Sequence, residues 1–336
     1  MRNTKSLFKN TRVLITGGTG SWGQVLTTQL LLKNPKEIII FSRGELGQVS
    51  MQRKFQNSKI RYIIGDIRDS DAINQACKNV DYVFHLAALK HVPVCEEQPQ
   101  EAIKTNIQGT INLINASINN KVKKVIDVST DKAVDPLNLY GMTKAVGEKL
   151  IIRANNLSDT RFVCIRGGNV MGSNGSVIPF FKDQIKSGSV KITDFQMTRY
   201  FLTLNEAIEL LFKATEKSGG GETFVMNMPA CYIKELAQVL IEDSDLKNIK
   251  ISEIGMRPGE KLDELLISQH ESPNTYIVDD AYYVIIPTLP IPSSKKVFEK
   301  IAKTCIKVSF KEFSSKTKIM NKNEIKTMLK NGGFIK

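Results

Sequence analysis

The chain has 336 residues, of which 41% are hydrophobic and 24% are charged, enough for one large domain or two closely joined domains with a real core. No run of eighteen apolar residues occurs, and the polar, basic stretch Met1–Asn10 has no apolar region, so neither an integral membrane segment nor a signal peptide is expected. Most of the net charge of +13 lies in residues 293–336, which hold twelve lysines and three glutamates without any nucleic-acid-binding signature, so nucleic acid is not an expected partner.

The first predicted unit is a buried strand at 12–16, followed by a glycine-rich turn and a helix to about residue 32. Glycines let the backbone approach a pyrophosphate, and the start of the helix offers N–H donors and a positive dipole. The spacing is Gly-x-x-Gly-x-x-Gly rather than the usual Gly-x-Gly-x-x-Gly, and a tight turn alone would also use glycines. We interpret it as a dinucleotide-binding turn. Its predicted cofactor-binding residues are Gly17, Thr19, Gly20, Ser21, Trp22 and Gly23.

The end of the second predicted strand, residues 37–41, indicates which nicotinamide cofactor is bound. An NAD-selective site would place an acid here for the ribose hydroxyls, but Ser42 and Arg43 follow the strand. Arginine at this point accommodates a 2′-phosphate, so NADP is favoured. Glu45 is close enough to keep NAD open, and Arg43 could also be an ordinary surface residue.

The third and fourth predicted strands, 61–64 and 82–86, also end in candidate ligand residues. Asp66 could reach the adenine, or it could cap the helix that begins near Asp69. Small residues after the fourth strand leave room for a cofactor, and a helix from about 100 to 119 follows. The further cofactor candidates are Asp66, Ile67, Ala87, Ala88, Lys90 and Thr105, and Lys90 and His91 are expected at the mouth of the site.

A fifth strand, 125–128, leads into the stretch with the strongest chemical signal. Tyr140 and Lys144 are four residues apart and share one face of a predicted helix. An ammonium beside a phenol stabilises the phenolate, so we expect Lys144 to lower the pKa of Tyr140 and make it a base for a sugar hydroxyl. Asp131 and Lys132 precede this pair, with Thr130 before them. The plain alternative is that Asp131 and Lys132 form only a helix-entry pair.

Strand and helix alternate over the first 150 residues, and a sixth strand follows at 162–165. This pattern predicts an α/β fold: a Rossmann-type, doubly wound parallel sheet with ligands at the carboxyl ends of its strands, and a smaller C-terminal lobe that binds substrate. The predicted domains are an NADP-binding domain at 1–170, a lobe at 171–292 and a basic segment at 293–336 whose order is not predicted. Arg199 and Arg257 are the candidates for holding a diphosphate, although each could form a structural salt bridge instead.

Five scattered cysteines without Cys-x-x-Cys spacing indicate reduced thiols in a cytoplasmic protein, and the three histidines show no metal-ligand pattern. No metal site is therefore predicted.

In combination, the glycine motif, Ser-Thr-Asp-Lys-Ala at 129–133 and Tyr-Gly-x-x-Lys at 140–144 resemble those of extended short-chain dehydrogenases/reductases. The stretches 87–93, 104–106, 175–181, 197–199 and 257–261 narrow the resemblance to the UDP-N-acetylglucosamine 4,6-dehydratases, especially the C5-inverting enzymes that begin pseudaminic acid synthesis. The resemblance covers about residues 11–290. Gly44 and Gly167 depart from the family pattern, which often has Asp and Tyr there; Gly167 bears on the shape of the sugar pocket.

This resemblance implies UDP-N-acetylglucosamine as substrate, a resident NADP and a homo-oligomer, either a dimer or a hexamer. The residues that we expect to contact the substrate are Lys90, His91, Asn169, Ser176, Val177, Thr193, Arg199, Arg257 and Glu260.

The hypothetical mechanism has Tyr140, assisted by Lys144, take the C4 hydroxyl proton as hydride leaves C4, with Thr130 orienting the sugar. A neutral Lys132 then removes the C5 proton and a protonated Asp131 assists loss of the C6 hydroxyl. A C5-retaining dehydratase, a UDP-sugar 4-epimerase and a non-enzymatic NADP-sensing or polyanion-binding protein remain the alternatives.

Overall fold

The computed structural model describes residues 7–172 and 176–335. Residues 1–6 of the polar amino-terminal stretch and residue 175 of the stretch 175–181 lie outside the described residues. Within the described part of the chain, no helix is both long and apolar enough to cross a membrane.

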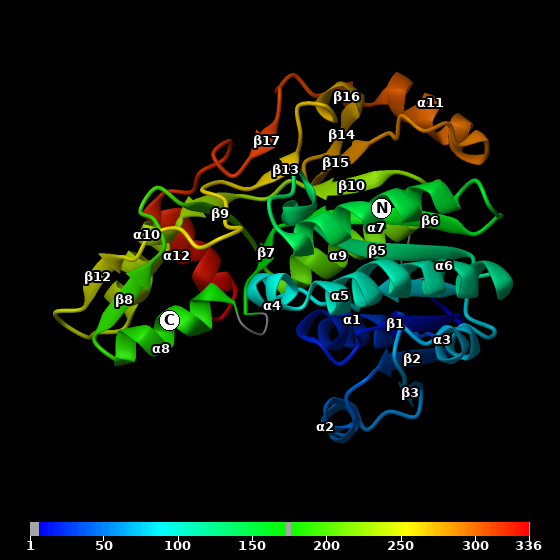
Figure 1. Ribbon diagram of the computed structural model, residues 1–336, viewed down its shortest axis with the longest axis horizontal. Coiled ribbons are helices and arrows are strands. Elements are labelled where there is room, and N and C mark those ends of the chain that lie inside the picture. Colours follow the sequence, from blue (N-terminus) through cyan, green and yellow to red (C-terminus); the bar gives the residue numbers. More distant parts are fainter. Residues whose placement is uncertain (1–6, 173–175, 336) are drawn as a thin grey trace.

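A sheet of ten strands, all within the described residues, forms the centre of the molecule (Figure 1). Its order is β16-β14-β15-β10-β6-β5-β4-β1-β2-β3, and the strands from β10 to β3 are parallel. The strands are β1 (Arg12–Thr16), β2 (Glu37–Ser42), β3 (Ile60–Ile64), β4 (Tyr82–His85), β5 (Lys124–Thr130), β6 (Arg161–Gly167), β10 (Thr223–Met226), β14 (Thr275–Asp279), β15 (Tyr282–Ile285) and β16 (Ile306–Lys307). The order 3-2-1-4-5-6 within it is that of the Rossmann fold, so the predicted fold class is confirmed.

Side chains alternate between the two faces of this sheet, because successive residues of a strand point in opposite directions. In β1, Val13 and Ile15 belong to the core on one face, together with Leu26 of α1 and Ile208 of α9. Leu14 belongs to the core on the other face, where α3, α6 and α7 pack. Both faces are therefore covered, which explains why the strands are apolar throughout rather than alternating.

The helices connect the strands and cover both faces. They are α1 (Ser21–Leu31), α2 (Glu45–Phe55), α3 (Ser70–Ala76), α4 (Val92–Glu97), α5 (Pro99–Ile103), α6 (Gly109–Asn119), α7 (Leu139–Ala154), α8 (Val177–Lys186), α9 (Leu204–Lys217), α10 (Ile233–Asp243), α11 (Lys295–Thr304) and α12 (Lys322–Asn331). The predicted helix 100–119 consists of α5, a π-helical turn (Lys104–Gln108) and α6. Short 3₁₀ turns occur at Asp131–Ala133, Ser272–Asn274 and Pro292–Ser294.

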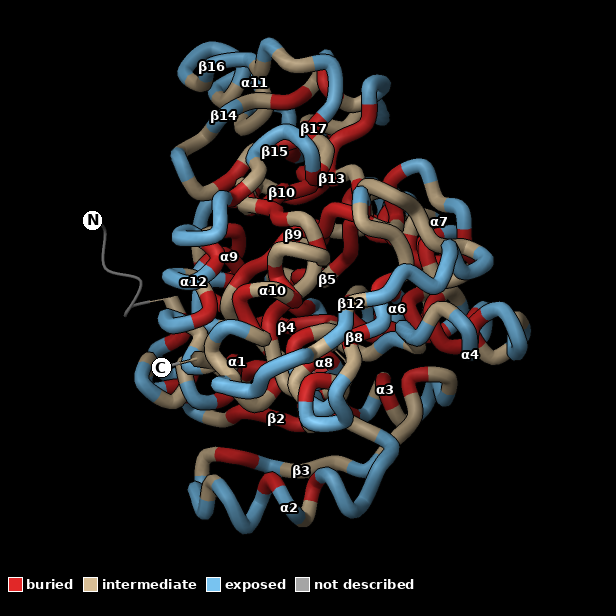
Figure 2. Tube along the Cα trace, turned by 90° about the vertical axis from the view of Figure 1, so that its left-hand side faces the viewer, coloured by how far each residue is buried: buried red, intermediate tan, exposed pale blue. Residues whose placement is uncertain are grey.

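A smaller lobe lies beside the carboxyl ends of the parallel strands (Figure 1). Its core joins α8, α10 and α12, and the trace of these helices is coloured as buried in part in Figure 2. Short strands complete it and the junction with the sheet: β7 (Asn169–Val170), β8 (Ser189–Ile192), β9 (Thr198–Leu202), β11 (Ala230–Tyr232), β12 (Lys250–Glu253), β13 (Leu265–Ile267) and β17 (Phe313–Ser314).

The chain passes between the sheet and the lobe more often than the predicted boundaries imply. After residue 171 it returns to the main sheet with α9 and β10, and again with β14 and β15. The lysine-rich segment 293–336 is part of the fold over its described residues: β16 pairs with β14, and α12 buries Ile325 and Leu329 in the core of the lobe. Its lysines are mainly the exposed face of these elements.

Candidate active site

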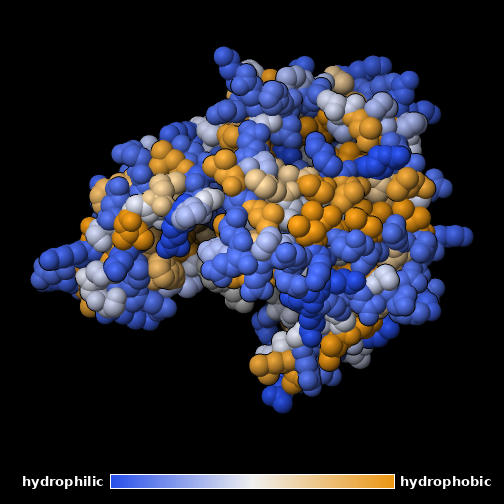
Figure 3. All heavy atoms as spheres, in the orientation of Figure 1, coloured by the Kyte–Doolittle hydropathy of each residue, from blue (hydrophilic) through white to orange (hydrophobic). Residues whose placement is uncertain are grey.

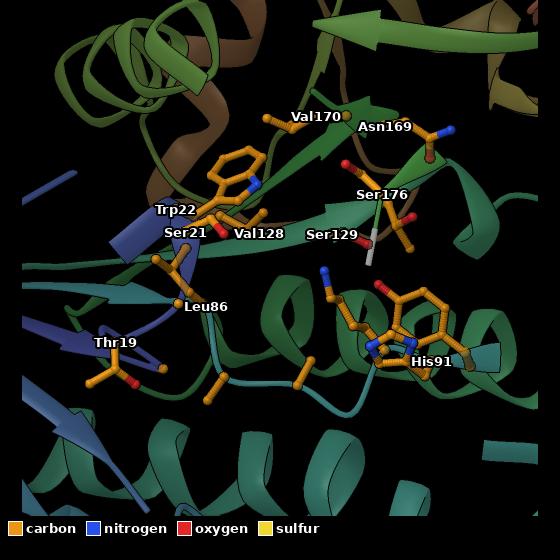
Figure 4. Close-up of a pocket in the computed structure, with 18 of the residues that line it drawn as sticks. Thr19, Ser21, Trp22, Leu86, His91, Val128, Ser129, Asn169, Val170 and Ser176 are labelled. Atoms are coloured by element: carbon orange, nitrogen blue, oxygen red, sulfur yellow. The ribbon is translucent and has the colours of Figure 1, made fainter. Parts of the chain in front are cut away.

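A cavity of about 690 Å³ lies where the parallel strands end and the lobe begins. This volume falls within the range of about 300–1,000 Å³ that is usual for small-molecule sites. In Figure 4, Ser21 and Trp22 lie on one side of the cavity and His91 on the opposite side, with Asn169 and Ser176 toward the lobe. The cavity is therefore built jointly by the sheet and the lobe.

The glycine-rich turn forms one end of this cavity. Gly17 has a φ of +67°, and a Cβ there would come within 2.8 Å of the backbone nitrogen of Ala87. Only glycine fits such a backbone. The turn aims the positive end of α1 at the cavity. The predicted cofactor residues that line the cavity are Gly17, Thr19, Gly20, Ser21, Trp22, Ser42, Arg43, Ile67, Ala87, Ala88, Lys90, Thr105 and Tyr140.

Arg43 and Asp66 lie together at the ends of β2 and β3. The Arg43 guanidinium is half-exposed and 4.0 Å from an oxygen of Asp66, which also pairs with Arg68 at 2.6 Å. The helix cap at α3 is Asp69, which accepts from two N–H groups of the first turn. The alternative that Asp66 caps this helix is therefore wrong. Asp66 pairs instead with Arg43 and Arg68, and it does not line the cavity.

The π-helical turn holds the loop after β4 in place. Asn106 lies on this turn; its side chain accepts a hydrogen bond from the N–H of Leu89 and donates one to the Leu89 carbonyl, and it also donates to Thr143. The neighbouring Thr105 lines the cavity. Such a turn inside a helix is typical of functional sites; here it fixes the loop that carries Lys90 and His91.

Tyr140 reaches the cavity from the first turn of α7. Asn138 caps this helix by accepting from the N–H of Gly141 at 2.8 Å, and it donates to the carbonyl of Gly259 at 2.9 Å. A Cβ on Gly141 would lie 2.1 Å from the carbonyl oxygen of Lys132. Glycine at 141 therefore allows α7 to touch the backbone of the Asp131–Lys132 turn, which brings Tyr140 next to Lys132.

We expect Gly141→Ala to separate α7 from this turn. Overpacking of this kind costs about 1–3 kcal/mol of stability, and the reaction rate should fall more than stability alone explains, because Tyr140 and Lys132 are displaced from each other. Gly147→Ala in the same helix is the matched control, since its added Cβ would meet nothing closer than 3.7 Å. Thermal melting and steady-state rates of both variants test this; equal rates in the two variants would contradict it.

Lys144 lies behind Tyr140 in a fully buried charge cluster. Its ammonium is 3.3 Å from both oxygens of Asp127, and His85 lies 3.9 Å from the same carboxylate and 2.7 Å from the hydroxyl of Thr16. Burial lowers the pKa of Lys144, but the charge and hydrogen bond of Asp127 together with the neighbouring Tyr140 outweigh burial and raise the pKa above the ordinary value. Burial lowers the pKa of His85 to about 4, so this imidazole is neutral. Lys144 is therefore a fixed cation.

The predicted lowering of the Tyr140 pKa is not what the structure gives. Burial raises the pKa of Tyr140 above its ordinary value, and this effect outweighs the lowering by Lys144, by Lys132 and by a hydrogen bond with Thr130. The neighbouring ammonium groups act in the predicted direction, but desolvation of the phenolate is the larger effect.

Lys132 lines the cavity, whereas its two carboxylate partners lie behind it. Its ammonium is 3.0 Å from Asp131 and 3.5 Å from Glu264, and Thr130 donates to the same oxygen of Asp131 at 2.9 Å. Burial lowers the pKa of Lys132, but the charges of Asp131 and Glu264 outweigh it and raise the pKa above the ordinary value. The expectation that burial leaves Lys132 neutral is therefore wrong for the protein alone: Lys132 is an ammonium.

The predicted substrate residues divide into two groups. Lys90, His91, Asn169, Ser176 and Val177 line the cavity. Thr193, Arg199, Arg257 and Glu260 do not, and neither do Gly23, Asp66, Asp131 and Lys144 of the other predicted sets.

Arg199 is buried and committed to the protein itself. Its guanidinium donates to the carbonyls of Thr198, Leu262 and Lys261 and lies 3.6 Å from Glu264. These contacts favour the alternative of a structural salt bridge over a diphosphate ligand. Arg257, in contrast, is exposed on the loop that Asn138 holds through Gly259.

Sequence reasoning missed Asp127, His85 and Glu264. For the first two a signal was present, because an acid and a histidine inside otherwise apolar strands have to be paired when they are buried. Glu264 gave no such signal; it joins Lys132 only through the fold.

A family model described as "Polysaccharide biosynthesis protein" matches residues 13–286. A UDP-N-acetylglucosamine 4,6-dehydratase (inverting) from Campylobacter jejuni is 44% identical over 299 residues, 87% of each chain. A protein named UDP-glucose 4-epimerase from Rickettsia conorii is 41% identical over 331 residues, 96% of each chain. The solved structure of Pen from Bacillus thuringiensis is 41% identical with a TM-score of 0.88, covering 96% of this chain and 99% of that one.

Proposed function

The chain belongs to the polysaccharide biosynthesis protein family, and from this premise we propose that it is a UDP-N-acetylglucosamine 4,6-dehydratase. The predicted resemblance to extended short-chain dehydrogenases/reductases is thereby confirmed. One observation carries the proposal: Lys132 lies on the cavity wall beside Tyr140, with Asp131 at 3.0 Å behind it. Oxidation at C4 needs only the tyrosine, whereas loss of water needs a second acid–base pair.

The turn at Gly17 fits a nicotinamide dinucleotide, because Gly17, Gly20 and the first residues of α1 line the cavity and offer backbone N–H groups and the positive end of the helix to a pyrophosphate. When bound, this cofactor accepts hydride from C4 and returns it to C6. The residues that would hold it are the glycine turn, Arg43, the alanines after β4 and Thr105. Arg43 supports NADP over NAD, because a guanidinium pairs phosphate oxygens.

Tyr140 takes the proton of the C4 hydroxyl. Thr130, which is hydrogen-bonded to Tyr140, orients that hydroxyl, and the fixed charge of Lys144 stabilises the phenolate. Lys132 also favours the phenolate, and a bound cofactor would add the positive charge of its oxidised ring to the site. Tyr140 is therefore a weak base in the protein alone and a stronger one in the complex.

Lys132 and Asp131 supply the acid–base pair for C5 and C6. Transfer of one proton along their 3.0 Å hydrogen bond turns an ammonium and a carboxylate into an amine and a carboxylic acid. The amine removes the C5 proton, and the carboxylic acid protonates the departing C6 hydroxyl. The pair returns to its starting state, because Lys132 gains one proton and Asp131 loses one. A proton from solvent is then added to C5 from the opposite face and gives the inverted product, and Tyr140 releases to solvent the proton that it took from the C4 hydroxyl.

The product is a 4-keto-6-deoxy sugar nucleotide for glycan synthesis of the pseudaminic acid type. The description of the family and the name of the C. jejuni relative support this role. Arg257 is the proposed contact for the diphosphate, since Arg199 is committed to the protein. A cytoplasmic location fits four buried free thiols among the five cysteines.

The protein is also proposed to act as a homo-oligomer. Apolar side chains gather on the face of the molecule over α7 (Figure 3). Ile103, Met142 and Val146 are each more than 40% exposed there. An exposed apolar stripe of this kind favours burial against a second copy.

The relatives named UDP-glucose 4-epimerase favour one second candidate, a UDP-sugar 4-epimerase, in which Asp131 and Lys132 take no part in chemistry. Incubation with UDP-N-acetylglucosamine separates the two. A dehydratase releases a product lighter by one water molecule, whereas an epimerase leaves the mass unchanged. Proton NMR of the product in deuterated water reports exchange and configuration at C5 and so tests inversion.

Arg43→Ala is expected to weaken binding of NADP about 10- to 150-fold, because a charge-assisted hydrogen bond contributes about 1.5–3 kcal/mol. Binding of NAD should change little, since it has no 2′-phosphate. Fluorescence of Trp22, the one tryptophan of the chain, reports binding directly from the cavity wall. Arg61→Ala, at an arginine of β3 that pairs with Glu37, is the control. Equal weakening of both cofactors would refute the assignment of Arg43.

A further inference from the structure

Glu264 is a buried carboxylate to which the mechanism above gives no task. It directly precedes β13 and is only 2% exposed. Its backbone is fixed on both sides, because its N–H donates to the hydroxyl of Ser315 at 3.0 Å and its carbonyl accepts from the N–H of the same residue at 2.8 Å. The side chain is thus held rigidly behind the cavity wall.

This side chain faces cations and an anion from several elements. One oxygen lies 3.5 Å from the ammonium of Lys132 and 3.6 Å from Arg199 of β9. Lys261, Asp131 and Tyr200 are the other titratable neighbours that interact with it. Because Arg199 is occupied by three carbonyls, Lys132 is the cation whose position can respond to Glu264.

Among the described residues, the second oxygen of Glu264 and the second oxygen of Asp131 are both buried without a hydrogen-bond partner. Buried polar atoms without partners are rare and call for an explanation. The two unpartnered oxygens are explained if both carboxylates share the ammonium of Lys132. Each carboxylate then offers one oxygen to Lys132, and its other oxygen is left to accept a proton.

We propose that Glu264 is a positioning residue for Lys132, the second carboxylate that holds its ammonium at the cavity wall beside Tyr140. This inference deepens the proposed function and rests on it for its catalytic meaning. Glu264 keeps Lys132 protonated while Asp131 is ionised, and it steers the proton that Lys132 gives up toward Asp131. Burial raises the pKa of Glu264 above its ordinary value, whereas the charge of Lys132 acts in the opposite direction, so the two groups are electrostatically linked.

The test is Glu264→Gln, which keeps shape and removes the charge. Loss of an anion beside an ammonium disfavours the protonated form, so the pKa of Lys132 should fall, by about 1–3 pH units for an opposite charge at this distance. NMR of ¹⁵N-labelled lysine, with the Lys132 signal assigned from Lys132→Arg, follows this ammonium without turnover. The signal should disappear at a lower pH in the variant than in the parent protein.

The pH profile of kcat gives the second readout. The amine of Lys132 is the base for C5, so kcat rises with pH as Lys132 loses its proton. In Glu264→Gln this rise in kcat should occur at lower pH, with KM nearly unchanged. Glu271→Gln is the control, since Glu271 is a partly buried carboxylate that pairs with Arg166 instead. It should lower thermal stability without moving the Lys132 signal or the profile.

The inference would be overturned if the Lys132 signal in Glu264→Gln stayed as in the parent protein while the melting temperature fell as in Glu271→Gln. Should Glu264→Gln fail to fold, the reciprocal measurement decides: the ¹³C carboxyl pKa of Glu264 must rise in Lys132→Met, and a constant value refutes the coupling. These NMR measurements do not depend on the reaction. A protein that fails to dehydrate the sugar but shows the shifted Lys132 signal would retain the inference and lose the proposed function.

Discussion

Tyr140→Phe should lower turnover of UDP-N-acetylglucosamine by about 10²- to 10⁴-fold, the usual contribution of a positioned general base. The phenol at the cavity wall is the proposed base for the C4 hydroxyl proton, and Lys144 behind it cannot substitute, because Asp127 holds it at 3.3 Å. Without C4 oxidation the C5 proton is not acidic, so every later step stops. Single-turnover absorbance of the reduced nicotinamide measures the loss at the first step.

Tyr200→Phe is the matched control. Its hydroxyl donates to the carbonyl of Phe313 at 3.0 Å and does not line the cavity. The substitution removes one buried hydrogen bond, worth about 0.5–1.5 kcal/mol of stability, and should leave turnover unchanged. If Tyr140→Phe reduced the nicotinamide at the parental rate, the assigned base would be wrong.

Lys132→Arg should separate oxidation from dehydration. Arginine keeps the positive charge between Asp131 and Glu264, so the fold should persist, but a guanidinium does not give up its proton in proteins. The dehydrated product should fall about 10²- to 10⁴-fold, while oxidation at C4 continues through Tyr140. Mass spectrometry of the sugar nucleotide and absorbance of the bound cofactor report the two steps.

Lys132→Met should likewise lose the dehydrated product while oxidation at C4 continues, but this variant should also be less stable. Two buried carboxylates lose their shared cation, and breaking a buried ion pair costs about 3–5 kcal/mol. Lys124→Met is the control, because Lys124 is a partly buried lysine that donates to the carbonyls of Thr215 and Ser218 away from the cavity. Dehydration by Lys132→Arg at the parental rate would instead refute the assignment of Lys132 as the base for C5.

The sequence alone was sufficient for the six parallel strands β1 to β6 of the central sheet. Local signals are strong there: strands of four to seven residues alternate with helices, and a glycine turn joins the first strand to the first helix. Because parallel strands bring their carboxyl ends to one edge, residues such as Arg43, Ala87 and Tyr140 could be expected to converge before any coordinates existed. The structure places all three on one cavity.

The lobe was less predictable, because its short strands and helices become stable only by packing against one another. The lysine-rich segment illustrates this. Its apolar positions are few, yet Ile325 and Leu329 of α12 complete the core around α10. Whether such a helix is ordered depends on a partner surface that lies about 80 residues earlier in the chain.

The sequence by itself determined the chemical groups of the site, since Tyr140, Lys144, Asp131 and Lys132 lie within one turn and one helix. Only the tertiary structure decided their charge states. Desolvation depends on what covers a group and pairing depends on what faces it, and both are supplied by distant segments. Asp127 makes Lys144 a fixed cation, and Glu264 joins Asp131 in keeping Lys132 an ammonium. Arg199 was drawn away from the substrate by carbonyls at 198, 261 and 262 that no local pattern reveals.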